Sequence, residues 1–177
     1  MRGTRVARRY ARALLELAGR PQAEQWGEEL KRFAAMVESP ELRERLASPQ
    51  LSLESRQQAM AKIAERLELS FPLRSLAVVV ARHGRISEMA AISDAYQDLV
   101  DQLLGRARAS LTFAAPPSDA QMQSVVAGLA SIARKQIIPT VTVDASLIGG
   151  VVAELEGKTY DGSLAHRLAQ AQRRLAG

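Results

Sequence analysis

Few side chains in this sequence could do chemistry, and their spacing argues against catalysis. The chain has no cysteine, which excludes disulfides, thiol nucleophiles and cysteine-ligated metals. Its two imidazoles, His83 and His166, both lie at arginine-rich and exposed ends of predicted helices, so neither is marked as the base of a nucleophilic triad. The carboxylates are spaced as solvated helix faces, so none is marked as a general acid or base. We therefore expect no catalytic residues, no metal and no cofactor.

A glycine-rich stretch near the C-terminus, residues 141–163, is the strongest candidate for a ligand site. Gly149-Gly150 lacks the Lys-Ser/Thr pair of a Walker loop and the spacing of a dinucleotide fingerprint. Glycines inside a strand more often permit a bulge or a close backbone approach, and aspartates beside turns bond their own backbone. We interpret the glycines as a bend in a strand and residues 161–163 as a turn into a last helix. The structural motif comprises Asp144, Gly149, Gly150, Asp161, Gly162 and Ser163.

The positive charge is concentrated at the N-terminus. Residues 1–20 hold six arginines and one glutamate, whereas residues 21–177 balance 18 basic against 18 acidic side chains, so the net charge of +5 lies in the first segment. Such a segment is a transit peptide, a contact for nucleic acid or membrane, or a helix that docks on a partner. Its apolar pattern continues into an ordinary helix, which argues against a transit peptide. Aromatic residues are too sparse for a stacking nucleic-acid surface, and no apolar run approaches the ~18 residues of a membrane span.

The first predicted helix carries two apolar stripes. The larger stripe is Val6, Tyr10, Ala13, Leu14 and Leu17, and we expect it to face the core. The second stripe is made mostly of small side chains, Ala7, Ala11, Leu15 and Ala18. It indicates either a helix that is central to its bundle or a groove that receives a partner helix.

Helical periodicity, serine or threonine caps and proline or glycine breaks continue to about residue 105. They predict six helices joined by short connections, which is typical of an all-α bundle. Trp26 is expected to fill its core. The fifth helix is apolar on most sides, so we expect it to be central. The predicted helices are 4–19, 21–38, 40–47, 52–67, 70–83 and 86–104.

After Gly105 the apolar residues recur at every second position, as in a β-strand. We expect strands at 107–115, 137–143, 147–155 and 159–160, with a helix from Ser118 to about residue 134 and another after Ser163. Pro139 confines the second strand to an edge or a bulge. The inward side of the first of these helices is predicted to be Val125, Val126, Leu129 and Ile132. The predicted fold class is α+β, mostly α: an N-terminal six-helix bundle, 1–105, and a small C-terminal β/α module, 106–177, that would gain stability from a partner.

Three motifs resemble one known family. The C-terminal one runs from Val143 to Gly150 (VDASLIGG) and resumes from Lys158 to Ser163 (KTYDGS); the others are 6–14 (VARRYARAL) and 81–85 (ARHGR). Together they resemble the delta subunit of F-type ATP synthase, whose mitochondrial counterpart is the oligomycin-sensitivity-conferring protein. Order and spacing agree over nearly the whole chain. The sequence departs from the family where Ala145 replaces a common proline and where His83 replaces the usual asparagine.

The resemblance implies a stator component with no active site, which couples rotation to ATP synthesis. Its bundle would bind N-terminal segments of the alpha subunits on the F1 head, and its C-terminal module would bind the C-terminal end of a b-type peripheral-stalk subunit. The protein would lie on the cytoplasmic face of the bacterial cell membrane, attached only through the complex. If the small-residue stripe and the fifth helix form the groove, the expected contacts are Ala7, Tyr10, Ala11, Leu14, Val79 and Arg85. A charged residue at Ala11 should then weaken F1 binding and leave the fold intact.

A second hypothesis from a different class is an RNA-binding helical bundle of the antitermination type, which also opens with an arginine-rich and alanine-rich helix. It predicts salt-dependent RNA affinity and an entirely helical chain. The strand pattern of 106–163 argues against it, and we expect no nucleic-acid partner.

Overall fold

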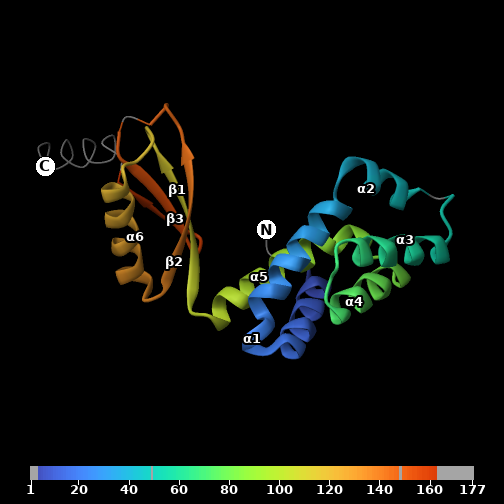
Figure 1. The fold of residues 1–177 in the computed structure, drawn as a ribbon. Coiled ribbons are helices and arrows are strands. Elements are labelled where there is room, and N and C mark those ends of the chain that lie inside the picture. Colours follow the sequence, from blue (N-terminus) through green and yellow to red (C-terminus); the bar gives the residue numbers. More distant parts are fainter. Residues whose placement is uncertain (1–3, 49, 148, 163–177) are drawn as a thin grey trace, which may run out of the picture. The chain divides into compact units, whose positions relative to one another are not determined.

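The computed structural model describes residues 4–48, 50–147 and 149–162. The chain divides after Leu103 into two compact units, close to the boundary expected at Gly105, which has a left-handed φ of +66°. The first unit is helical, and the second is a small sheet with a helix on one face (Figure 1). The predicted combination of a mostly helical chain with a small C-terminal sheet is confirmed.

The helical unit opens with α1 (Arg5–Val37), which is sharply kinked at Gly19 (φ 56°, ψ −173°) just before Pro21. Figure 1 shows the two halves of α1 running in different directions. The sequence predicted two helices separated at this glycine, and the break is where it was expected. Thr4 caps the first half by accepting a 3.1 Å hydrogen bond from the Ala7 amide.

The remaining helical elements follow the predicted segments closely. The main packing is between α1 and α5, where the Tyr96 hydroxyl donates to the Ala23 carbonyl at 3.2 Å. Trp26, Phe33 and Ile92 are buried in this core, as expected for Trp26. The elements are α2 (Pro40–Ala47), α3 (Leu53–Arg66), α4 (Phe71–Arg82), the short 3-10 helix η1 (Ile86–Glu88) and α5 (Met89–Leu103).

The start of α4 is capped from a distance. Ser70, the serine expected to cap the predicted helix 70–83, occupies the N-cap position, but its side chain makes no capping bond. Instead the buried carboxylate of Glu29 accepts hydrogen bonds from the Ser70 amide (2.6 Å) and hydroxyl (2.9 Å). A negative charge at a helix N-terminus is favourable because the helix dipole is positive there. This contact ties the second half of α1 to α4.

The second unit holds a four-stranded sheet among its described residues, in the order β2-β1-β3-β4. β1 and β2 are parallel and are joined by α6, whereas β1–β3 and β3–β4 are antiparallel. Pro139 lies on the edge strand β2, as predicted. Ser118 and Gln121 form a capping box at the start of α6. The elements are β1 (Arg106–Phe113), α6 (Asp119–Ala133), β2 (Gln136–Val143), β3 (Val151–Leu155) and β4 (Lys158–Asp161).

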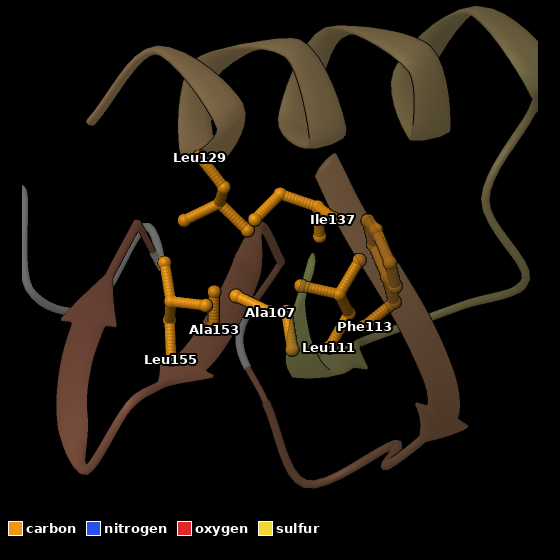
Figure 2. Packing of buried hydrophobic residues seen from close by; sticks show 8 residues of the cluster. Ala107, Leu111, Phe113, Leu129, Ile137, Ala153 and Leu155 are labelled. Atoms are coloured by element: carbon orange, nitrogen blue, oxygen red, sulfur yellow. The ribbon is translucent and has the colours of Figure 1, made fainter. Parts of the chain in front are cut away.

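The core of this unit is a single layer between α6 and one face of the sheet (Figure 2). Val125 and Val126 pack against it, as predicted. Ile132 was predicted to face inward but is 59% exposed, because Leu129 and Ala133 turn toward the sheet and leave Ile132 on the flank of α6. The buried residues are Ala107, Ala109, Leu111, Phe113, Leu129, Ile137, Ala153 and Leu155.

Candidate partner-binding surfaces

In the first half of α1 the small-residue stripe is buried, which agrees with a helix central to its bundle, whereas most of the larger stripe lies at the surface. Ala7 and Ala11 are 0% exposed, and Ala18 is also buried. Leu17, from the stripe that was expected to be in the core, is 68% exposed. Small side chains let a helix approach its neighbours closely, so the alanine stripe packs inward and the bulkier stripe is left at the surface. The prediction that the larger stripe faces the core is therefore wrong, with Leu14 as its one buried member.

The structure separates the six predicted contact residues into two groups. Ala7, Ala11 and Leu14 are buried within the helical unit. Tyr10 and Arg85 are half-buried at the surface and meet directly, since the Arg85 Nη1 donates to the Tyr10 hydroxyl at 3.2 Å. Val79, on α4, is 39% exposed.

A second contact fixes the beginning of α1 beside the connection between α4 and α5. The Thr4 hydroxyl donates to a carboxylate oxygen of Glu88 at 2.6 Å. With the Arg85–Tyr10 bond it aligns the first turns of α1 with the C-terminal end of α4. Surface residues of α1 and α4 are thus held next to each other before any partner arrives.

Four apolar residues in the first half of α1 that are exposed or half-buried form a line, which we name the outer stripe: Val6, Tyr10, Ala13 and Leu17. Their spacing of i, i+4, i+7 and i+11 places them on one helix face. On α4, Phe71 is 80% exposed and Val79 is also at the surface. Exposed apolar side chains grouped on one helix face are typical of a protein-binding surface.

Basic residues flank the outer stripe. A shallow depression on α1 is lined by Val6 and Ala13 together with Arg5, Arg8, Arg9 and Arg12, and it also reaches Glu16. All four arginines are exposed. The Arg9 guanidinium lies 5.9 Å from the centre of the Tyr10 ring, within the range of a cation–π contact. The surface is therefore apolar along its centre and positively charged along one side.

In the second unit, the glycine-rich motif is a loop and not part of a strand. Gly149 and Gly150 have φ values of +73° and +86°, a left-handed conformation that favours glycine. They precede β3, which starts at Val151 and not at the predicted 147. Asp144 accepts a 2.9 Å hydrogen bond from the Ser146 amide, which confirms that this aspartate bonds its own turn. Hydrogen bonding from Ser146 lowers the pKa of the Asp144 carboxyl.

The end of the motif continues the sheet. Asp161 is the last residue of β4 and pairs with Val152, and the Gly162 amide donates to the Val151 carbonyl at 2.9 Å. The predicted turn at 161–162 is therefore wrong, because the ladder extends to Gly162. A Cβ at Gly162 would lie 3.1 Å from the Val151 carbonyl oxygen, so this close approach favours glycine. Ser163, the predicted cap, lies outside the described residues.

The loop glycines border a groove in the second unit. Its lining includes Gly149 and Gly150, Gln121 and Ser124 of α6, and Phe113. The sheet face opposite α6 is polar and carries Arg108, Ser110, Thr140, Glu154 and Thr159. The groove is lined mainly by apolar residues, with a few polar side chains among them.

A search of residues 4–48, 50–147 and 149–162 finds no group of three or more His, Cys, Asp or Glu that could hold a metal ion. Within the same ranges, no helix is both long enough and apolar enough to cross a membrane. His83 is exposed just after α4.

A helical unit and a small α/β unit, each with surfaces shaped for contact, define an assembly subunit. The sequence profile described as "ATP synthase delta (OSCP) subunit" matches residues 6–175. The chain is 36% identical to ATP synthase subunit delta of Anaeromyxobacter sp. (strain Fw109-5), with 96% of each chain covered. It is 34% identical to that of Citrifermentans bemidjiense, with 94% of each covered. The chain therefore belongs to the ATP synthase delta (OSCP) subunit family.

A solved structure shares the fold. One chain of the Toxoplasma gondii mitochondrial ATP synthase hexamer matches with a TM-score of 0.67 and 19% identity, over 98% of this chain and 99% of that one. The resemblance seen in the sequence is confirmed. The protein is a non-catalytic stator subunit in the peripheral stalk of ATP synthase. The comparisons give no support to the RNA-binding hypothesis.

Sequence reasoning missed the outer stripe as a surface. All four of its members were assigned to the stripe expected in the core, although Tyr10 was also named as an expected contact, because periodicity identifies apolar faces without saying which one is buried. The usable signal was size: the opposite face is mainly alanine, which suits close helix packing, whereas Tyr10 and Leu17 are too large for it.

Proposed function

We propose that the helical unit binds an N-terminal segment of an ATP synthase alpha subunit on the F1 head, through the outer stripe and the adjoining surface of α4. In this role the two halves of α1 act as separate helices of a six-helix bundle comprising 1–105. The observation that carries the proposal is the apolar line at the surface of α1, whose first turns are tied to the loop after α4 by the hydrogen bond between Arg85 and Tyr10. An amphipathic helix laid on this line would bury its apolar face.

The six predicted contact residues then have two roles. Tyr10, Val79 and Arg85 touch the partner, and the hydrogen bond between Arg85 and Tyr10 sets their positions. Ala7, Ala11 and Leu14 lie beneath them and support α1 from the core side. A preformed surface loses little conformational entropy on binding, which favours the long-lived contact that resistance to torque requires.

A matched pair of substitutions tests this surface. Ala13→Glu places a charge on the outer stripe, and Ala35→Glu places the same charge at an exposed position on the second half of α1. We expect Ala13→Glu to lower the affinity for F1 depleted of its delta subunit by about tenfold or more, since desolvating a carboxylate costs at least about 1–2 kcal/mol. Ala35→Glu should bind as the unsubstituted chain does. Co-sedimentation measures both, and equal affinity of the two variants would reject the outer stripe.

For the second unit, 106–177, the proposed partner is the C-terminal end of a b-type stalk subunit. The groove lined by α6 and the Gly149-Gly150 loop supports this because its lining is mainly apolar, with polar Gln121 and Ser124 among it. Ser124→Arg would fill the groove, whereas Ser131→Arg alters another exposed serine of α6 that does not line it. We expect only Ser124→Arg to weaken binding of the b subunit in a pull-down titration. Equal binding by both variants would place the stalk contact elsewhere.

These two contacts connect the F1 head to the stalk and hold the protein at the cytoplasmic face of a bacterial cell membrane, through the complex alone. Reconstituted membranes that contain the membrane sector test this placement. The protein should sediment with them when the b subunit is present and stay in the supernatant when it is absent. Sedimentation with lipid vesicles alone would contradict it.

A further inference from the structure

The basic side of the outer stripe is not explained by apolar docking. Arg5, Arg8, Arg9 and Arg12 occupy the first two turns of α1, and all are exposed. Within the part of the chain that the structure describes, no carboxylate lies within ion-pair distance of these four side chains. Glu16 is the first acidic residue of α1.

The same end of the surface gains further positive charge from α4 and the loop after it. Arg85 contacts Tyr10, next to Arg9, and Arg82 is exposed one turn earlier. Glu88 is the nearby acid, and its carboxylate accepts from the Thr4 hydroxyl. Like charges gathered on one side of an apolar line repel each other, and an oppositely charged partner relieves that repulsion.

We infer that the segment which covers the outer stripe carries carboxylates along the edge facing Arg5, Arg8, Arg9 and Arg12, so that the partner is an acidic amphipathic helix. The inference rests on the proposed function, and it adds the chemical character of the segment. Apolar contact with Val6, Ala13 and Leu17 supplies most of the affinity, and the arginines set the register and direction of the bound helix.

Two features favour an acidic helix over a nucleic acid. The arginines alternate with Val6 and Ala13 in one depression, and an apolar floor suits an amphipathic peptide better than a phosphate backbone. Tyr10 is the one aromatic side chain on the outer stripe, and its ring is already covered by Arg9. A single-stranded nucleic acid would need several such rings for stacking.

The experiment uses the full chain and a labelled synthetic peptide that copies the N-terminal segment of the alpha subunit from the same complex. A second peptide has every Asp and Glu changed to Asn and Gln. Fluorescence anisotropy gives both dissociation constants at about 0.05 M and about 0.3 M salt, because screening shortens the electrostatic range between these concentrations. Exposed ion pairs contribute about 0.2–1 kcal/mol each, so four pairs predict about tenfold tighter binding of the acidic peptide at low salt.

The double variant Arg8→Gln/Arg12→Gln removes two charges and keeps Arg9 and Arg85, which make the cation–π contact and the hydrogen bond with Tyr10. Because two of four pairs remain, the preference for the acidic peptide should fall from about tenfold to about threefold, while the neutral peptide binds as before. The control Arg32→Gln/Arg66→Gln removes two exposed charges from the second half of α1 and from α3. It should keep the preference.

The outcomes separate the inference from the proposed function. If the two peptides bind equally tightly at low salt, the charge inference is overturned and the proposed function stands. If neither peptide binds, the proposed alpha-subunit contact fails and this inference fails with it. A single-stranded RNA oligonucleotide that binds as tightly as the acidic peptide and loses affinity in Arg8→Gln/Arg12→Gln would show that the arginines serve nucleic acid.

Discussion

The two units of this protein bury their cores in different ways. In the helical unit, α1 packs mainly on α5, with large side chains such as Phe33, Tyr96 and Leu30 fully buried. Among the described residues, the sheet unit buries only eight hydrophobic residues in one apolar layer, whereas the helical unit buries 24. A thin core buries less apolar area and therefore stabilises less. We therefore expect the sheet unit to be the less stable of the two in the isolated protein and to gain more stability from a bound partner.

The largest expected effect concerns Ala11 in the helical unit. Ala11→Glu would place a carboxylate at a fully buried position, which should cost at least about 3 kcal/mol because nothing nearby compensates the lost hydration. We expect the helical unit to unfold and F1 binding to be lost with it. Far-ultraviolet circular dichroism and thermal melting measure this. A folded variant that binds F1 weakly would restore the original expectation that Ala11 is a contact residue.

The comparison predicts unequal tolerance of core truncation. Leu111→Ala in β1 and Leu30→Ala in α1 each remove a fully buried leucine side chain, at a cost of about 2–5 kcal/mol. Leu111→Ala should unfold the sheet unit locally, whereas Leu30→Ala should leave the helical unit folded. Hydrogen exchange followed by mass spectrometry reads each unit separately. In the unsubstituted chain the amides of the sheet unit should also exchange faster than those of the helical unit. Equal protection of the two units would contradict the expected difference in stability.

A smaller effect appears at alkaline pH and belongs to the helical unit. Burial raises the pKa of the Tyr96 hydroxyl to about 12, from the usual 10.0. The folded state therefore keeps this proton while the unfolded chain loses it above pH 10. The contribution to stability is complete below pH 10 and falls between pH 10 and 12, by roughly 2–3 kcal/mol in all. Denaturant titrations at pH 9 and pH 11.5 should show this loss, and Tyr96→Phe should lose less over the same interval.

Local sequence signals predicted the element boundaries well. Thr4, Ser52 and Ser118 cap helices through contacts within three residues, and the alternation from Ala107 to Phe113 matches the buried face of β1. The predictions that failed concern features that depend on tertiary packing. The hydrogen bond from Ser70 to Glu29 joins residues 41 positions apart, and no local sequence pattern predicts it. The orientation of the α1 stripes depends on which neighbours are present, so an apolar period alone leaves it undecided.

The same limit applies to the candidate site. Tyr10 and Arg85, two of the expected contact residues, touch each other, and their contact with a partner stays a prediction. The prediction also placed buried alanines among the contacts, because small residues suit both a core and a groove. The sequence predicted an unusual backbone conformation at Gly149 and Gly150, and both have positive φ angles. It did not predict that β3 begins only after them.

The central claim is that the outer stripe of α1 meets the F1 head. Because the chain has no cysteine, a single one at Leu17→Cys or, as a control, at exposed Ala35→Cys can be labelled selectively. The rate of maleimide modification is measured for each variant with and without F1 depleted of its delta subunit. We predict that F1 slows labelling at position 17 at least about tenfold and leaves position 35 unchanged. Labelling at position 17 that proceeds at the same rate while the variant is bound to F1 would contradict the claim.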